Sequence, residues 1–360
     1  MDAQTKLNVV FMGTPDFAAV ILRALHRWDG CTVSAVYCQP DRPAGRGNKL
    51  HTPAVKVLAQ ELGLPVYQPE NFKDATSVDA LRALAPDVLV VAAYGLILPQ
   101  TVLDIPRIAP INVHGSLLPL YRGAAPIQRA IQDGRRETGV SIMRMEAGMD
   151  TGAVYHMAAL PIGDHTAGSL HDALAELGAR TLITVLGNIA AYPPQPQDGS
   201  KATYAPKMHK SDGFINWDMS ASQVHAHIRA VTPWPGARAR VFSAIRGVTR
   251  VALGVGREGA LKPTGVPAGQ IWMLPGGELA VSCSDHFYNL GTVRPENRKD
   301  MSARDFAHGY LDYPSGYCGR CLGPNEDTAE PCGTAGPTEP ADTSAPSDAH
   351  ETPACELCVD

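Results

Sequence analysis

Residues 111–119 read Ile111-Asn112-Val113-His114-Gly115-Ser116-Leu117-Leu118-Pro119. An apolar run leads into this stretch, which predicts a buried strand that stops abruptly in a Gly-Ser turn. Because side chains alternate along a strand with a period of two, Asn112 and His114 point to the same side at the strand's end. In an open parallel sheet, ligands bind at the carboxyl ends of the strands.

These two side chains suit chemistry on a carbonyl group. Asn112 carries an amide dipole, and the imidazole of His114 can change its protonation near neutral pH. The alternative is structural: an asparagine that satisfies a turn and a histidine that caps a nearby carbonyl. On this stretch alone, both interpretations stay open.

A third polar residue, Asp150, lies in a tight turn between Gly148 and Gly152. Aspartate is common in turns, so a turn role is the simpler interpretation. If the turn folds back onto the end of strand 111–114, the carboxylate of Asp150 would meet the imidazole of His114.

The first half of the chain alternates strand and helix patterns. Thr14 is expected to cap the first helix, with Pro15 at its first position. The pattern predicts a doubly wound, mostly parallel α/β sheet of Rossmann-like type. The sequence Gly13-Thr14-Pro15 is not the Gly-x-Gly-x-x-Gly fingerprint, so NAD binding is not expected. Strands are predicted at residues 8–13, 32–38, 66–67, 87–93, 111–114, 139–145 and 153–159. Helices are predicted at residues 15–26, 54–62, 77–84, 125–132 and 168–190.

An unusual segment, residues 39–50, follows the second predicted strand. Proline and glycine deny it regular structure, and Arg42, Arg46 and Lys49 give it positive charge. Such a loop can drape over a phosphate backbone. A solvated surface loop is the simpler interpretation, and the segment by itself favours it.

The second half has a different pattern. Residues 1–191 are assigned to the first domain and the Pro-rich residues 192–212 to a linker. Short strands broken by glycine and proline predict a small OB-like β-barrel over residues 213–313. These strands are predicted at residues 239–243, 248–253, 269–273, 278–282 and 288–293. Basic residues surround the predicted entrance of the barrel: Lys207, Lys210, Arg229, Arg238, Arg240, Arg246 and Arg250.

Residues 314–360 predict a disordered, acidic tail, because they are rich in Pro, Ala, Thr, Ser and acidic residues. The tail carries nine acidic residues and one basic residue, so it accounts for more than the total formal charge of −5. The remaining 313 residues therefore carry about +3, which permits a nucleic-acid partner without arguing for one. The chain has no signal-peptide pattern and no apolar stretch long enough for a membrane span, so a cytoplasmic protein is expected.

The cysteines allow two interpretations. Cys31, Cys38 and Cys283 fall in folded regions and predict small buried hydrophobes. The two Cys-x-x-Cys pairs of the tail form a zinc-ligand pattern, although the segment between them is longer than in a zinc ribbon. Free or redox-active thiols are preferred here, with zinc as the alternative. The pairs are Cys318 with Cys321 and Cys355 with Cys358.

Taken together, the motifs resemble the folate-dependent formyltransferases. The resemblance rests on Asn112-x-His114, on residues 115–119 (GSLLP) and 121–126 (YRGAAP), and on residues 150–152 (DTG). The Asn/His/Asp set is shared with purine-pathway, nucleotide-sugar and hydrolase relatives, so it specifies the chemistry rather than the substrate. Within this family, the sequence resembles most the members that act on initiator tRNA. This likeness spans roughly residues 5–312. The motifs for this are residues 12–18 (MGTPDFA), the basic loop 39–49, residues 204–207 (YAPK) and residues 233–235 (PWP).

The resemblance implies that a formyl group passes from 10-formyltetrahydrofolate to the α-amine of methionyl initiator tRNA. It implies that Asn112, His114 and Asp150 are catalytic, and that folate is a co-substrate with no metal required. A monomer is expected. The implied folate contacts are Ser116, Leu117, Leu118, Pro119, Tyr94, Gly95 and Leu96. The implied tRNA contacts are Arg42, Arg46, Lys49, Lys207 and Lys210.

Three alternatives remain at this stage. The same chemistry could act on another amine, such as an amino sugar or glycinamide ribonucleotide, although the basic loop and the barrel disfavour this. A formyl hydrolase would use water as the acceptor. A catalytically silent RNA-binding protein would not need Asn112, His114 and Asp150 together.

Overall fold

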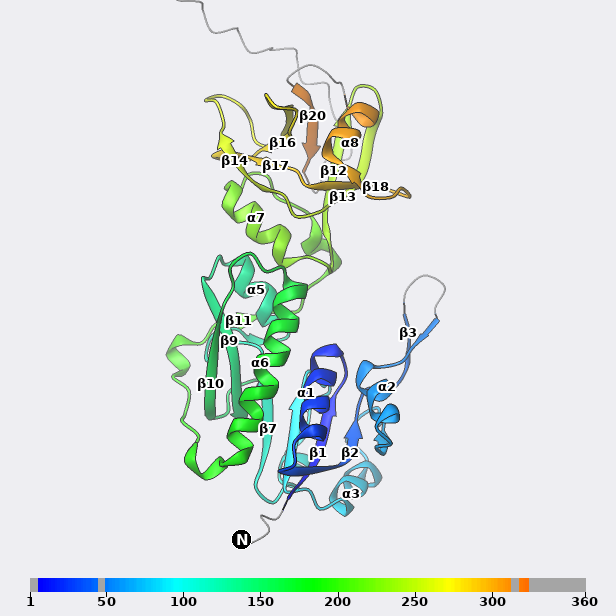
Figure 1. Cartoon of the computed structure of the whole chain (residues 1–360), viewed down its shortest axis with the longest axis vertical. Coiled ribbons are helices and arrows are strands. Elements are labelled where there is room, and N and C mark those ends of the chain that lie inside the picture. The colour runs from blue at the N-terminus through cyan, green and yellow to red at the C-terminus, as the bar shows by residue number, and fades with distance from the viewer. Residues whose placement is uncertain (1–5, 45–48, 312–316, 324–360) are drawn as a thin grey trace, which may run out of the picture. The chain divides into compact units, whose positions relative to one another are not determined.

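The computed structural model of the chain describes residues 6–44, 49–311 and 317–323 (Figure 1). Its first half contains a sheet whose seven described strands lie in the order β10-β9-β7-β6-β1-β2-β5. The strands from β7 to β5 pair in parallel, whereas β9 pairs antiparallel with both β7 and β10. This arrangement confirms the predicted doubly wound, mostly parallel sheet. The strands are β1 (Leu7–Gly13), β2 (Cys31–Tyr37), β5 (Val66–Tyr67), β6 (Val88–Ala92), β7 (Ala109–His114), β9 (Glu137–Arg144) and β10 (Val154–Pro161).

Alternate side chains of β1 enter two different hydrophobic cores, because both faces of the sheet are covered. Val9 and Phe11 belong to one core, and Val10 and Met12 belong to the other. The first core is covered by α1 (Asp16–Arg27), α2 (Ala54–Glu61), α5 (Pro126–Gln132) and α6 (Ala167–Gly187). The second core is covered by α3 (Ala75–Ala83) and α4 (Gln100–Leu103).

No helix in the described part of the chain combines the length and the apolar character that a membrane span requires.

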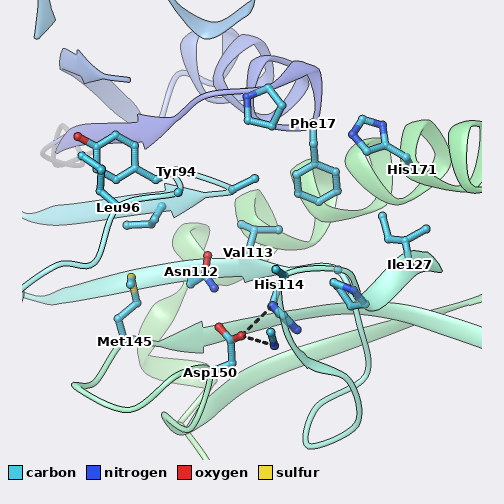
Figure 2. Close-up of a pocket in the computed structure, with 18 of the residues that line it drawn as sticks. Phe17, Tyr94, Leu96, Asn112, Val113, His114, Ile127, Met145, Asp150 and His171 are labelled. Atoms are coloured by element: carbon cyan, nitrogen blue, oxygen red, sulfur yellow. Dashed lines mark hydrogen bonds and ion pairs between the residues drawn. The ribbon is translucent and has the colours of Figure 1, made fainter. Parts of the chain in front are cut away.

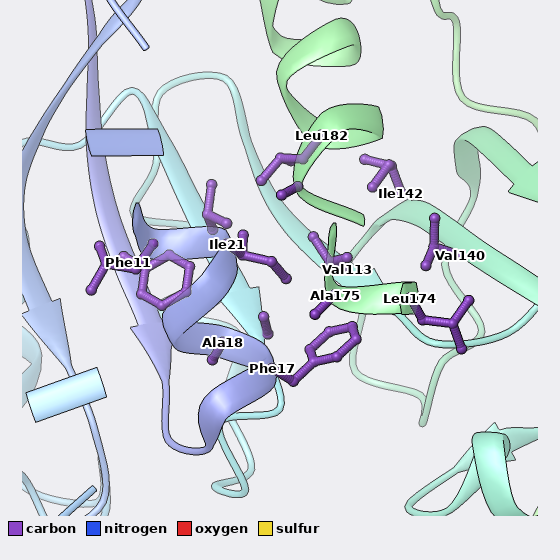
Figure 3. Close-up of a cluster of buried hydrophobic side chains, with 14 of the residues drawn as sticks. Phe11, Phe17, Ala18, Ile21, Val113, Val140, Ile142, Leu174, Ala175 and Leu182 are labelled. Carbon is purple, nitrogen blue, oxygen red and sulfur yellow. The ribbon is translucent and has the colours of Figure 1, made fainter. Parts of the chain in front are cut away.

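Helices α1 and α6 pack against each other over the central strands (Figure 3). Ile21 of α1 and Leu174 of α6 are fully buried, and burial of each such side chain contributes about 1.5–3 kcal/mol. At Gly178, a Cβ atom would lie 2.9 Å from Val113 of β7, so glycine lets α6 approach the strand closely. The packing fixes the N-terminal ends of both helices beside the end of β7.

Two predicted helix starts are wrong. Helix α1 begins at Asp16, with Pro15 rather than Thr14 at the N-cap position. The hydroxyl of Thr14 instead donates to the Tyr94 carbonyl at 2.8 Å, which ties the end of β1 to the loop after β6. Helix α3 begins at Ala75 and not at residue 77, because the Asp74 carboxylate caps it by accepting from the backbone N–H of residue 77 at 2.8 Å.

The basic segment contains a short antiparallel hairpin of β3 (Arg42–Ala44) and β4 (Lys49–His51). The prediction that proline and glycine deny this segment regular structure is therefore wrong at its two ends. Pro43 is tolerated because a two-stranded ribbon leaves one edge of each strand unpaired. Arg46 lies outside the described residues, and for Lys49 only the backbone is described.

The second half forms an antiparallel sheet that curls into a half-barrel, with nine strands among the described residues. It confirms the predicted small β-domain. Helices α7 (Ala221–Ala230) and α8 (Ala303–Tyr310) contribute to its core. The strands are β12 (Ala237–Ser243), β13 (Gly247–Leu253), β14 (Arg257–Leu261), β15 (Gln270–Met273), β16 (Leu279–Ser282), β17 (His286–Asn289), β18 (Thr292–Pro295), β19 (Met301–Ser302) and β20 (Tyr317–Leu322).

Three details of this domain differ from the prediction. Strand β14 and helix α8 were not expected, and the strand predicted at 288–293 is divided between β17 and β18. Strand β20 lies between β12 and β15 in the sheet, although its residues fall in the segment assigned to the disordered tail. The tail prediction is therefore wrong for Tyr317–Leu322, because backbone pairing to two neighbouring strands can order a segment with few bulky apolar side chains.

Candidate active site

A cavity of about 520 Å³ opens at the carboxyl ends of β6 and β7 (Figure 2). Asn112, His114 and Asp150 all line it. Its other walls come from the loop after β6, from the first turns of α1 and α5, and from α6. The sheet therefore brings three polar side chains that are far apart in the sequence to one cavity, at the edge where ligands bind in open α/β sheets.

His114 is held in one orientation by the backbone. Its side chain is 7% exposed, and Nε2 lies 3.0 Å from the Tyr121 carbonyl oxygen. A carbonyl only accepts hydrogen bonds, so Nε2 carries the proton of this contact. Nδ1 is then the ring nitrogen that faces Asp150 and the cavity.

Asp150 adopts a left-handed backbone conformation, with φ of 53°. Its carboxylate oxygen Oδ2 accepts a hydrogen bond from the backbone N–H of Gly123 at 2.9 Å and lies 3.7 Å from Nδ1 of His114 (Figure 2). The second distance suits an ion pair but exceeds a hydrogen bond. Gly123 must be glycine here, because its φ is 121° and a Cβ atom would lie 2.7 Å from the Ala205 carbonyl oxygen.

The side-chain amide of Asn112 is partly exposed in the cavity and makes no hydrogen bond to the described part of the chain. Its donors are therefore free for a ligand. When the His114 ring is protonated, its Nδ1–H and the Asn112 amide present hydrogen-bond donors on the same side of β7. This arrangement can stabilise a negative charge that develops on an oxygen atom between them.

The rest of the cavity is mostly apolar. In Figure 2, Tyr94, Leu96 and Met145 lie on one side of Asn112, and Phe17 and Ile127 lie on the other. Burial raises the pKa of the Tyr94 hydroxyl, so this group stays neutral at physiological pH. The residues from α1, α5 and the strand end at Met145 were not predicted from the sequence, because single apolar residues in helices and loops carry no site signal.

The structure does not place the turn of residues 116–119 in the cavity wall. The hydroxyl of Ser116 donates to the Leu120 carbonyl at 2.6 Å, and the backbone N–H of Leu118 donates to the Ser141 hydroxyl at 3.0 Å. Leu117 lines a separate cavity. Ser116, Leu117, Leu118 and Pro119 thus adjoin the cavity at Gly115 without lining it, and their role as folate contacts stays a prediction. By contrast, Tyr94, Gly95 and Leu96 do line the cavity.

The described basic residues that were predicted to contact tRNA are exposed. Arg42 begins β3, and Lys207 and Lys210 follow β11 (Tyr204–Ala205). Strand β11 pairs in parallel with β8 (Arg122–Gly123), so the chain before Lys207 lies directly beside the loop that holds Asp150. The segment that leads from this loop therefore carries the positive charges of Lys207 and Lys210.

Cys31, Cys38, Cys283 and Cys318 are buried, and Cys321 is partly buried. Cys318 lies on β20 in the core of the second domain, Cys321 packs against that core, and desolvation raises the pKa of Cys321. Within the described ranges, no three His, Cys, Asp or Glu side chains gather to hold a metal ion. Cys355 and Cys358 lie outside the described residues, so the structure does not test their zinc pattern.

The fold and the site together define a formyl transferase. The formyl transferase family model matches residues 6–186, and the model of the formyl transferase C-terminal domain matches residues 207–311. The chain belongs to this family, which confirms the resemblance seen in its motifs.

Its curated relatives carry a more specific name. The chain is 49% identical to the methionyl-tRNA formyltransferase of Desulfovibrio desulfuricans over 343 residues, covering 91% of this chain and 99% of that protein. It is 40% identical to the methionyl-tRNA formyltransferase of Pseudoalteromonas translucida, covering 89% and 99%.

Solved structures share the fold at low sequence identity. The N-formyltransferase of Helicobacter canadensis, in complex with folinic acid and dTDP-3-aminofucose, matches with a TM-score of 0.56 and 15% identity, covering 81% of this chain and all of that one. HypX of Aquifex aeolicus, in complex with tetrahydrofolic acid, matches with a TM-score of 0.53 and 17% identity, covering 84% and 47%.

Proposed function

We propose that the protein transfers the formyl group of 10-formyltetrahydrofolate to the α-amine of methionine on initiator tRNA, which gives the formylated tRNA used in translation initiation. One observation carries the proposal: Asn112, His114 and Asp150 meet in a single cavity at the carboxyl edge of the sheet, in a chain 49% identical to a methionyl-tRNA formyltransferase. The acceptor tRNA makes the cytoplasm the proposed location.

The amide of Asn112 and Nδ1–H of protonated His114 act on the formyl oxygen. As the amine attacks the formyl carbon, negative charge grows on that oxygen. Donors that are already in place stabilise this charge, and loss of one such donor typically lowers the rate by about 10²–10³-fold. The reaction proposed here needs no metal ion for this step. When the tetrahedral intermediate collapses, the bond from the formyl carbon to N10 of the folate breaks, and N10 takes up a proton to replace the one that the amine loses, which gives tetrahydrofolate.

Asp150 holds the imidazolium and helps to remove the proton that the attacking amine loses. Its carboxylate lies 3.7 Å from Nδ1 of His114, where it can pair with the ring when the ring is protonated. The Gly123 N–H bond fixes one carboxylate oxygen, which leaves the other to accept a proton. General base catalysis of this kind contributes about 10²–10⁴-fold.

The apolar part of the cavity is the proposed binding site for the pterin ring of folate. Phe17, Leu96 and Met145 offer apolar contact, and the backbone at Gly95 offers polar groups, because the Tyr94 carbonyl is already bound to Thr14 and Gln39. A small set of placed polar groups in an apolar cleft is typical of sites for heteroaromatic ligands. For the folate contacts, the proposal keeps Tyr94, Gly95 and Leu96 in the cavity wall, together with the turn after Gly115, which comprises Ser116, Leu117, Leu118 and Pro119.

The exposed cations are the proposed tRNA contacts. Arg42 and the hairpin it belongs to would reach the acceptor stem, and Lys207 and Lys210 would contact phosphates. Residues 1–191 are the proposed catalytic domain, 192–212 the linker and 213–313 the tRNA-contacting domain, and the protein acts as a monomer.

A labelled-formyl assay tests the proposal. The protein is mixed with 10-formyltetrahydrofolate carrying a labelled formyl group and with charged initiator tRNA, and the label is followed in tRNA and in free formate. Label on the methionyl amine supports the proposal. Free formate without labelled tRNA would identify a hydrolase, and transfer to an amino sugar or to glycinamide ribonucleotide instead would identify a different acceptor.

A further inference from the structure

Gln197 connects the Asp150 turn to a buried cation. Its side-chain nitrogen donates to the carbonyl oxygens of Asp150 and Gly152, both at 2.8 Å. Its side-chain oxygen accepts from Nε of Arg122 at 3.1 Å and from Nη2 of Arg122 at 2.7 Å. Both polar ends of the amide are therefore used, and each end makes two contacts.

One of the carbonyls that Gln197 holds belongs to Asp150 itself, the residue of the turn whose backbone is left-handed, and the other belongs to Gly152, two residues further on. Asp150 has φ of 53°, a conformation that non-glycine residues keep only when their surroundings enforce it. The direction of the Asp150 side chain follows from this backbone conformation. Fixing both carbonyls thus fixes where the carboxylate points, 3.7 Å from His114.

The side-chain oxygen of Gln197 is also linked to the carboxylate of Asp150, through Arg122 and the residue that follows it. Arg122 is 6% exposed, and it directly precedes Gly123, whose N–H binds Oδ2 of Asp150. Gln197 therefore joins the backbone of the Asp150 turn to the loop that supplies the carboxylate's hydrogen-bond donor.

The segment around Gln197 is attached on both sides. Gln195 exchanges two backbone hydrogen bonds with Val154, at 2.8 and 2.9 Å. Further along, the Thr203 carbonyl accepts from the backbone N–H of Arg122 at 2.9 Å. Residues 195–203 consequently bridge the Asp150 turn and the Arg122 loop, and only Gln197 among them contacts both through its side chain.

We infer that Gln197 is a positioning residue for the formyl transfer, and that it acts by holding Asp150 in its left-handed conformation. The inference rests on the proposed function. Gln197 does not line the cavity, so it acts through Asp150 and not on the substrates.

Two variants of the full-length protein separate the contacts. Gln197→Met keeps the side-chain volume and removes all four hydrogen bonds. Gln197→Glu keeps an acceptor for Arg122 but cannot donate to the two carbonyls. Both should lower kcat by about 10–100-fold, because small displacements of a reacting group cost rates of this order. The KM values for folate and tRNA should stay within about threefold.

Gln195→Ala is the matched control, because the Gln195 side chain is exposed and donates only to the nearby Pro193 carbonyl. It should keep wild-type kcat. A Gln197→Glu variant with wild-type kcat would overturn the inference, since the donation to the carbonyls would then be dispensable.

A double-mutant cycle with Asp150→Asn tests whether the effect passes through the carboxylate. Once the carboxylate is gone, Gln197→Met should reduce the residual kcat by less than about twofold. A full, multiplicative loss in the Asp150→Asn background would mean a general structural role and would contradict the inference. Absence of formyl transfer by the wild-type protein would instead refute the proposed function, so the two failures are distinguishable.

Discussion

Oδ2 of Asp150 lies 3.7 Å from Nδ1 of His114, while Nε2 of the same ring is bound to the Tyr121 carbonyl. The imidazole therefore presents one nitrogen to the cavity and cannot rotate without breaking its backbone contact. A carboxylate at this position can pair with the ring when the ring is protonated, and it can take up a proton from a bound amine. The chemistry proposed here depends on this pair and on the amide of Asn112.

Asp150→Asn removes the charge and preserves the shape. Asparagine tolerates the left-handed backbone and can still accept from Gly123, so the variant should fold normally. We expect kcat for formyl transfer to fall by about 10²–10³-fold with KM values within threefold, because the lost interaction is made in the transition state. Steady-state kinetics with both substrates measure this, and a raised KM with unchanged kcat would contradict the role.

The placement of Asn112 and His114 could be predicted because it follows from strand geometry. A period of two puts both side chains on one side of β7, and an apolar run that stops at a turn marks the carboxyl end. Alternating strand and helix patterns likewise predicted the sheet. Their catalytic roles remain predictions that the geometry supports.

Other features could not be predicted because they depend on contacts distant in the sequence. Gln197 stands in a Pro-rich stretch that resembles a linker, and its importance arises from carbonyls 45 and 47 residues away. In the turn at 116–119, the backbone N–H of Leu118 binds the Ser141 hydroxyl 23 residues away, a contact that the family motif alone does not indicate. Strand β20 is ordered by neighbouring strands rather than by its own composition.

Arg42→Ala should weaken productive engagement of tRNA and leave folate unaffected. The side chain is exposed on β3, so its removal takes away one cation without disturbing a core. We expect KM for methionyl-tRNA to rise about 3–10-fold, and the slope of log affinity against log salt to decrease by about one. Titration with tRNA at several salt concentrations measures both quantities.

Arg23→Ala serves as the control for that measurement, because Arg23 is an exposed arginine on α1. It should leave the tRNA KM and the salt slope unchanged. A loss of folate affinity in Arg42→Ala, or an equal loss of tRNA affinity in both variants, would count against the proposed role of the hairpin.

Asp87→Asn should lower the stability of the first domain at neutral pH. The backbone N–H of Asn8 and the guanidinium of Arg107 hold the pKa of Asp87 below its ordinary value. A carboxyl whose pKa is depressed by folding stabilises the protein above its unfolded pKa, and this contribution disappears as the pH falls through the folded pKa.

The expected loss is about 1–2 kcal/mol in the free energy of unfolding at pH 7. It should shrink below about pH 4, where the wild-type carboxyl begins to take up a proton. Urea unfolding at pH 7 and at lower pH measures this difference. Asp79→Asn, a change in an exposed pair with Arg82, should cost less than about 1 kcal/mol. A pH-independent loss in Asp87→Asn would contradict the assignment.

The buried cysteines should resist alkylation in the folded protein. Burial raises the pKa of Cys38 to about 11 and that of Cys283 to about 12, so few of these thiols are ionised at pH 8. Because the thiolate is the reactive form, iodoacetamide should modify them only after unfolding. Mass spectrometry of labelled peptides shows which sites react, and rapid native labelling of Cys38 would contradict its burial.

The zinc alternative for the tail is tested on the full-length chain. Truncation before β20 would remove a strand of the second domain, so Cys355→Ser with Cys358→Ser is the better comparison. We expect equal zinc content in the wild-type protein and the double variant, as for free thiols. A loss of one zinc per chain in the double variant would establish a metal site that includes this pair.

The most direct test of the central claim is the rate of labelled formyl transfer from 10-formyltetrahydrofolate to methionyl initiator tRNA by His114→Ala, with tRNA affinity measured on the same sample. The claim that Asn112, His114 and Asp150 together stabilise the formyl oxygen predicts a loss of about 10²–10³-fold in the transfer rate, with tRNA affinity within threefold of wild type. Near-native turnover by His114→Ala would contradict it.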